Sequence, residues 1–296
     1  MWQDLPPDET FEITARGHCV AAYANGAGDE TLLLLNGGPG LCSQHLRAPH
    51  LPLVEHGYRI VIHDQLDTGA SAHPGDPALW TLEGYVQEVE ALRRALGLGR
   101  IHLLGHSWGG WLAIEYALTH PDTLQSLVLA DTCGDIPHLM EEAAGLKAGL
   151  GEETAAMMAA CERKGRFDDP DYLAAVAELD RRHVFTMKQR PAPSQRSADS
   201  FNLALYNHMQ GPNEYVFTGN LKSWSRIDEL TRLTVPTLVI GGRHDVMTPA
   251  CTARLADALP NAQYVIFENS SHVPHYEENE AYIAAVGAFL DAHRAT

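Results

Sequence analysis

Long apolar runs are missing from this chain of 296 residues. A stretch such as Thr31–Leu35 is far shorter than the roughly 20 apolar residues that cross a bilayer. The first residues, Met1–Glu9, are acidic and contain two prolines, the opposite of a signal or transit peptide. We therefore expect neither a membrane-spanning segment nor a targeting peptide.

Cysteine and positive charge are also scarce. The five cysteines are odd in number and lack paired spacing, which favours reduced thiols in the cytoplasm and shows no metal-binding knuckle. Lys and Arg total 21 against 38 Asp and Glu, a formal net charge of −17. Such a body repels nucleic acid and anionic membrane surfaces. We expect a cytoplasmic protein with neither of these partners.

What the chain does have is an alternation of strand-like and helix-like segments, typical of a mostly parallel sheet with helices on both faces. Eight strands are expected, at 11–15, 19–24, 31–35, 59–63, 101–104, 127–129, 237–240 and 264–267, the first two as a hairpin. Flanking helices are expected at 81–96, 111–119, 249–259 and 280–293. The later strands are short and apolar, which predicts burial on both faces. Asn279 is expected to cap the last helix, and Pro249 suits the first turn of its own.

The alternation stops between about residues 134 and 232. This region has helix-forming runs at 139–150, 152–164 and 171–184 and a Pro/Ser-rich piece at 190–197, without a strand of the buried parallel type. We interpret it as a helical lid inserted between the sixth and seventh strands. The division is then a core of residues 1–133, a lid of 134–232 and a second core part of 233–296. A separate helical domain is the alternative.

The pattern G-x-S-x-G occurs at Gly105, Ser107 and Gly109, where an apolar run becomes an amphipathic one. This pattern predicts a nucleophile on a sharp strand-to-helix turn. The turn needs strained backbone angles at the serine and little bulk two residues away on each side. Ser107 is therefore the expected catalytic nucleophile.

A serine nucleophile needs a base and an acid that orients the base. Asp245 follows the strand expected at 237–240, and His272 follows the one at 264–267. The order Ser, Asp, His is that of the α/β-hydrolase arrangement. We expect Asp245 as the acid and His272 as the base. Asp131, after the sixth strand, is the reserve acid, and His275 is the reserve base or a residue at the pocket rim.

Two amide donors should face the developing oxyanion. One is expected to be the N–H of Trp108, directly after the nucleophile. The other is expected in the glycine-rich loop at 36–40, where amides can turn toward a ligand without obstruction by Cβ atoms. The Gly38 amide is the favoured donor, and Gly37 shapes the turn beside the substrate. A plain glycine turn is the alternative for this loop.

Four segments carry a family resemblance: residues 36–40, 64–71, 105–110 and 271–274, which read NGGPG, DQLDTGAS, GHSWGG and SHVP. Together they resemble the proline iminopeptidase family of α/β-hydrolases over nearly the whole chain. The branch most similar includes the tricorn-interacting aminopeptidase and bacterial amino-acid amidases. Residues 206–215 resemble the same branch, which implies that Glu214 binds the substrate's α-amino group and that Tyr206 lines that pocket. A lid salt bridge for Glu214 and core packing for Tyr206 are the alternatives.

Three positions depart from the family pattern. Asn36 stands where the family has histidine, and its amide can still hydrogen-bond the loop. Asp67 stands where glycine is usual; aspartate tolerates left-handed backbone angles, and its carboxylate could lie near the cleft. Val246 stands where a second ammonium-binding glutamate is common, which weakens the case for recognition of a charged N-terminus.

The expected activity is that of a serine hydrolase that cleaves an amide after a small N-terminal residue of a small-molecule or short-peptide substrate. No metal or organic cofactor is expected, and the sequence does not indicate the oligomeric state. The first rival is the same triad acting on an ester, a lactone or a xenobiotic amide, motivated by Val246. The second rival is a non-catalytic binding or scaffold protein with the same fold.

Overall fold

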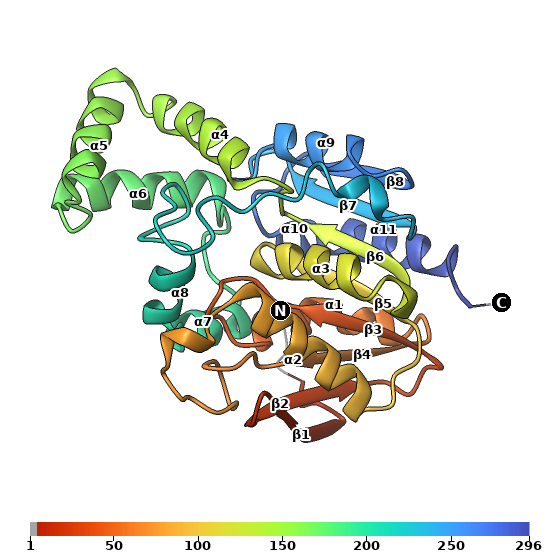
Figure 1. Ribbon diagram of the computed structural model, residues 1–296. Coiled ribbons are helices and arrows are strands. Elements are labelled where there is room, and N and C mark those ends of the chain that lie inside the picture. Colours follow the sequence, from red (N-terminus) through yellow and green to blue (C-terminus); the bar gives the residue numbers. More distant parts are fainter. Residues whose placement is uncertain (1–4, 296) are drawn as a thin grey trace.

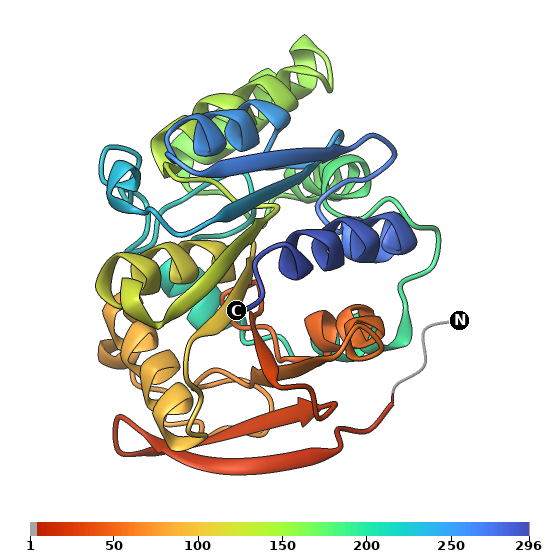
Figure 2. The same cartoon turned by 90° about the vertical axis from the view of Figure 1, so that its right-hand side faces the viewer.

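The computed structural model describes residues 5–295 and is built on one eight-stranded sheet (Figures 1 and 2). The first four residues of the acidic N-terminal segment lie outside the described part. The strands are β1 (Glu9–Ala15), β2 (His18–Asn25), β3 (Glu30–Leu35), β4 (Tyr58–His63), β5 (Ile101–His106), β6 (Leu124–Ala130), β7 (Thr237–Gly242) and β8 (Ala262–Phe267). Their order is β1-β2-β4-β3-β5-β6-β7-β8, with β2 antiparallel to β1 and β4 and all other pairs parallel. The expected α/β fold with a mostly parallel sheet is confirmed.

Helices cover both faces of the sheet because side chains of a strand alternate between its two sides. Leu33 and Leu35 pack in the cluster that holds α2 (Leu82–Ala95), α3 (Trp108–Thr119) and α9 (Pro249–Asp257). Leu32 and Leu34 pack in the cluster that holds α1 (Gln44–His50) and α11 (Asn279–Asp291). Figure 2 shows α1 and α11 on one side of the sheet and α2 and α3 on the other. None of the helices in the described part is long and apolar enough to cross a membrane.

The chain changes direction across the sheet at β3, which pairs with β4 on one side and β5 on the other. Ligands of open parallel sheets bind outside the carboxyl ends of the strands at such a switch point. Leu35, the last residue of β3, pairs with Gly105 near the end of β5. The glycine-rich loop and the segment around Ser107 therefore leave the sheet side by side.

Five helices lie between β6 and β7 in the sequence and stand beyond the carboxyl end of β6 (Figure 1). They are α4 (Ile136–Ala148), α5 (Glu152–Lys164), α6 (Pro170–His183), α7 (Ala192–Asp199) and α8 (Leu203–Met209). A short helix, α10 (Pro274–Glu277), follows β8. We refer to α4–α8 and their connections as the inserted helices.

Several local expectations need correction. The strand β8 is not buried on both faces: Tyr264 is 55% exposed, because β8 is one of the two edge strands and pairs only with β7. The helix α3 begins at Trp108 rather than at residue 111. Asn279 does not cap α11 but is its first residue, and its side-chain amide donates to the carbonyl oxygens of Pro49 and His275. Pro249 does occupy the first turn of α9.

Candidate active site

Ser107 sits between the end of β5 and the start of α3 with φ 56° and ψ −123°, a strained conformation for a residue with a side chain. The glycines on either side make this turn possible. A Cβ on Gly105 would lie 2.1 Å from the carbonyl oxygen of Gly109, and one on Gly109 would lie 2.0 Å from that of Leu35. The strained serine and the two crowded glycines are the geometry that G-x-S-x-G predicts for a nucleophile elbow.

The loop after β3 lies directly against this serine. A Cβ on Gly37 would lie 3.2 Å from the Cβ of Ser107, so only glycine fits there without displacement. Gly38 has φ +122° and precedes a cis peptide bond to Pro39. The Asn36 amide donates to the Leu41 carbonyl at 2.7 Å, so asparagine does bind the loop as expected. Gly37, Gly38 and Ser107 line one cavity.

Trp108 is the first residue of α3, where amides lack a partner within the helix and the helix dipole favours negative charge. Its indole is fully buried and donates to the side-chain oxygen of Gln65 at 2.9 Å. Gln65 belongs to the segment 64–71, so this segment fixes the residue that carries the expected oxyanion donor. The Asp64 carboxylate in turn accepts hydrogen bonds from the amides of Ser43 and Ala70.

His272 and Asp245 come together from the loops after β8 and β7. His272 Nδ1 lies 2.7 Å from Asp245 Oδ1, which also accepts a hydrogen bond from the Met247 amide at 2.9 Å. Burial by itself would lower the pKa of His272, but the Asp245 carboxylate and its hydrogen bond outweigh burial, with smaller contributions from Glu214 and Glu277. The net effect raises the pKa above its ordinary value, as an imidazole that accepts a proton requires.

Ser107 and His272 line the same cavity. No hydrogen bond joins their side chains within residues 5–295, and catalytic contacts of this kind are often long before substrate binds. The order Ser, Asp, His along the chain thus brings a serine, an imidazole and a carboxylate to one end of the sheet.

The two reserve residues lie deeper. Asp131 is fully buried, and burial followed by repulsion from Asp245 raises its pKa well above the ordinary value. Its Oδ2 lies 3.9 Å from His106 Nε2. His275 is fully buried and does not line the cavity, so the expected position at the pocket rim is wrong. The reason is that Pro274 starts α10 here, which turns His275 inward against His106.

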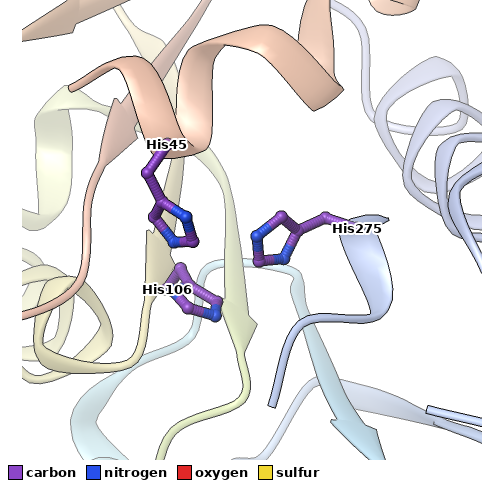
Figure 3. A group of neighbouring side chains, drawn as sticks. All are labelled: His45, His106 and His275. Carbon is purple, nitrogen blue, oxygen red and sulfur yellow. The ribbon is translucent and has the colours of Figure 1, made fainter. Parts of the chain in front are cut away.

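Figure 3 shows His275 with two further buried imidazoles, His45 and His106, which form part of the cavity wall. The ring centroids are 4.6 to 5.5 Å apart. Burial lowers the pKa of all three rings below the ordinary value and is the largest cause of each shift. The pKa of His45 falls to about 3. The three rings are therefore neutral at neutral pH. Their nitrogen atoms lie within 4.8 Å of one another, the one group in residues 5–295 with donors close enough to hold a metal ion. Imidazoles of this kind suit transition metals such as zinc.

Glu214, from the inserted segment after α8, lines the same cavity as Ser107. Its two carboxylate oxygens accept hydrogen bonds from the Tyr206 hydroxyl at 2.7 Å and from the Gln210 amide at 2.9 Å. No ion pair to Glu214 occurs among residues 5–295, so the lid salt bridge is not what holds this side chain. Tyr206 also lines the cavity and contacts Phe201 edge-on at 5.1 Å. The structure thus brings Glu214 and Tyr206 together beside the serine.

The two remaining departures from the family pattern lie away from the cavity. Asp67 has φ 68°, in the left-handed region, and its carboxylate accepts hydrogen bonds from the Trp80 indole and the Gly75 amide. This carboxylate therefore stabilises its own loop rather than facing the cleft. Val246 is buried, and its amide donates to the His183 carbonyl at 3.0 Å. Neither residue lines the cavity.

Several other residues that line the cavity were not predicted from the sequence. Phe185, Arg190 and Phe201 line the cavity, which has a volume of about 180 Å³. Phe185 and Arg190 lie in the connection between α6 and α7, a segment without helical or strand periodicity. Gln210, the partner of Glu214, did lie within the segment 206–215 that carries the resemblance. The apolar rings give the cavity a wall suited to a small apolar group.

Comparison with known proteins supports these observations. A family model for the alpha/beta hydrolase fold matches residues 30–279. The chain is 32% identical to a proline iminopeptidase of Heyndrickxia coagulans over 283 residues, which are 95% of this chain and 98% of that protein. The crystal structure of a proline iminopeptidase from Mycobacterium smegmatis is similar, with a TM-score of 0.88, 34% identity and coverage of 96% of this chain and 98% of that one. The crystal structure of VinJ is similar with a TM-score of 0.91, 31% identity and coverage of 98% and 100%.

Proposed function

Because the chain belongs to the proline iminopeptidase family of α/β hydrolases, we propose that it removes a small N-terminal residue, proline above all, from short peptides or amides. It is an enzyme, a serine hydrolase of the aminopeptidase kind. The observation that carries the proposed site is the 2.7 Å contact between His272 and Asp245 beside a cavity that Ser107 and Glu214 share. This arrangement supplies a nucleophile, an oriented base and a fixed carboxylate within one small space.

In the proposed reaction, His272 takes the proton of the Ser107 hydroxyl as its oxygen attacks the carbonyl carbon of the scissile amide. The amides of Gly38 and Trp108 hold the oxyanion of the tetrahedral intermediate. His272 then gives the proton to the leaving nitrogen, the C–N bond breaks, and the acyl group remains on Ser107. Water attacks this ester by the same route and releases the free N-terminal residue. Asp245 stabilises the imidazolium form of His272 in both halves.

Glu214 is the proposed anchor for the substrate's ammonium group. Its carboxylate is held by two neutral donors, Tyr206 and Gln210, which fix its position without cancelling its charge. Charge-assisted hydrogen bonds strengthen where water is excluded. We propose that the inserted helices act as a lid that excludes it. Val246 leaves this ammonium site without the second carboxylate common in the family, so Glu214 is expected to bind the ammonium group through one carboxylate.

A panel of substrates tests the proposal. Prolyl and alanyl anilides with a free amine are compared with N-blocked anilides, simple esters and lactones. We expect turnover of the free-amine anilides, loss of turnover on N-blocking, and no activity in Ser107→Ala. Faster cleavage of blocked amides or lactones would instead favour the alternative of a non-peptide ester, lactone or xenobiotic amide. Full activity in Ser107→Ala would contradict the mechanism itself.

The anchor is tested by Glu214→Gln, which keeps the shape of the side chain, removes the charge and replaces one of the two accepting oxygens with an NH2 donor. The variant is expected to raise KM for free-amine substrates by about 10- to 100-fold, the usual loss for a hydrogen bond to a charged group. Neutral esters should change little. Glu141→Gln is the matched control, since Glu141 lies on the inserted helix α4 and its side chain is 78% exposed. Equal effects on both substrate classes would indicate a structural role for Glu214.

We also propose a cytoplasmic location. The five cysteines are free in the structure, and four of them are buried. Thiols of this kind persist in a reducing compartment.

A further inference from the structure

The cavity beside Ser107 is lined by a second charged residue, whose charge is opposite in sign to that of Glu214. Arg190, in the connection between α6 and α7, lines the same cavity as Ser107 and Glu214. Its guanidinium carbon lies 4.3 Å from the centre of the Phe185 ring, and its Nη1 donates to the Ser194 hydroxyl at 3.2 Å. Stacking on an aromatic face holds a guanidinium in a fixed plane.

Arg190 forms no ion pair with a carboxylate among the described residues; burial lowers the pKa of its guanidinium, and the more distant Asp180 carboxylate acts against this effect. Among residues 5–295 no Asp or Glu oxygen lies within 4.0 Å of Arg190, although acidic residues outnumber basic ones in the chain by 38 to 21. Neighbouring arginines on the inserted helices, such as Arg166, Arg181 and Arg182, each pair with a carboxylate. A guanidinium has five N–H donors, and one of those of Arg190 is used. Arg190 is therefore a charged group with donors to spare on the wall of the substrate cavity.

We propose that Arg190 binds the carboxylate of the leaving group, so that the preferred substrates are dipeptides with a free C-terminus. This inference rests on the proposed function, in which Glu214 binds the ammonium group and Ser107 attacks the bond that follows. A dipeptide carries its ammonium on one side of the scissile amide and its carboxylate on the other. A small cavity that has one carboxylate and one guanidinium on its walls matches this zwitterion. An arginine can bind a carboxylate through two parallel N–H bonds, which orients the leaving group as well as holding it.

Binding is measured first, without turnover. Calorimetry with the Ser107→Ala enzyme compares the dipeptide Pro-Ala with its C-terminal amide. We expect the free acid to bind about 10- to 100-fold more tightly than the amide, the range for hydrogen bonds to charged groups. The added substitution Arg190→Gln should remove this preference. Equal binding of acid and amide, or no binding of either, overturns the proposal.

Turnover with active enzyme separates this inference from the proposed function. Arg190→Gln is expected to lower kcat/KM for Pro-Ala by about 10- to 100-fold, and that for Pro-Ala amide and prolyl anilide by less than about threefold. Lys188→Gln is the matched control, a cation on the same connection that does not line the cavity, and should behave as the parent enzyme. Equal losses on acid, amide and anilide would mean that Arg190 only supports the fold and would overturn the proposal. A preference for the acid in binding without hydrolysis of any of the three would overturn the proposed function and leave the carboxylate site standing.

Discussion

The choice between two buried carboxyl groups, Asp245 and Asp131, can be decided by a matched pair of substitutions. Asp245→Asn removes the charge that holds the imidazolium of His272 and disturbs the tautomer in which Nδ1 carries the hydrogen. Its Oδ1 accepts from both His272 and Met247, so the replacement amide must satisfy two donors with one oxygen. Loss of the equivalent orienting charge in serine proteases lowers kcat by about 10,000-fold. At 1.36 kcal/mol for each factor of ten, this is about 5 kcal/mol of transition-state stabilisation.

Asp131→Asn is the control because both carboxyls are buried near each other at this end of the sheet. Burial, and then the neighbouring Asp245, raise the pKa of Asp131 well above its ordinary value, which favours the neutral form of its carboxyl. Asparagine has almost the same shape and no charge, so we expect the exchange to remove little of what Asp131 contributes. One neutral hydrogen bond contributes about 1 kcal/mol, so kcat should fall by less than about tenfold.

The assay is steady-state hydrolysis of prolyl anilide at pH 8, with urea unfolding to show that both variants are folded. The reasoning is refuted if Asp131→Asn loses as much activity as Asp245→Asn while remaining folded. That result would mean that Asp131 is ionised and orients the base.

Two further outcomes are expected. Gly109→Ala should destabilise the fold by about 3 kcal/mol or more in urea unfolding, because its Cβ would lie 2.0 Å from a backbone oxygen that must move. The control is Gly145→Ala in the helix α4, where a Cβ meets open space. This variant should instead stabilise the fold by about 0.5–1 kcal/mol. Dialysis against EDTA should leave kcat/KM unchanged within about twofold, since the proposed reaction uses only groups of the chain; activity lost to EDTA and restored by zinc would instead assign a metal to the three-histidine cluster.

The strands and the larger helices were predictable because their periodicity is strong and local. The helix α5 has the predicted bounds, and six of the eight strands, β2 to β7, match an apolar run that is mostly buried. The strand β8 has the same kind of sequence but lies at an edge, and its exposure depends on sheet order, which no local pattern reveals. The helix α1 was missed because it is seven residues long and contains Pro49, normally a sign that a helix ends.

The candidate site divides in the same way. Ser107, Asp245 and His272 each follow a core strand, so the parallel order of the sheet brings them to one edge. Glu214 and Tyr206 came only from the family resemblance, because their positions depend on how irregular connections fold over the cavity. Arg190 was not found at all: its proposed role depends on the absence of an ion pair to it among residues 5–295, a property of the folded chain that the sequence does not show.

The electrostatics of the cavity link substrate binding to the base. The Glu214 carboxylate is one of the charges that raise the pKa of His272. An ammonium group bound to Glu214 offsets that charge, so the pKa of His272 should be lower in the complex than in the free enzyme.

Activity needs neutral His272 and is lost as the pH falls through the pKa of this imidazole. The pH profile of kcat/KM reports the pKa in the free enzyme, and that of kcat reports the pKa in the complex. For free-amine substrates the acid limb of kcat should therefore lie at lower pH than that of kcat/KM, whereas for neutral esters the two limbs should coincide. In Glu214→Gln the kcat/KM limb should itself move to lower pH. Coincident limbs for the free-amine substrate, or an unmoved limb in Glu214→Gln, would show that Glu214 and His272 are not coupled and that the ammonium group binds elsewhere.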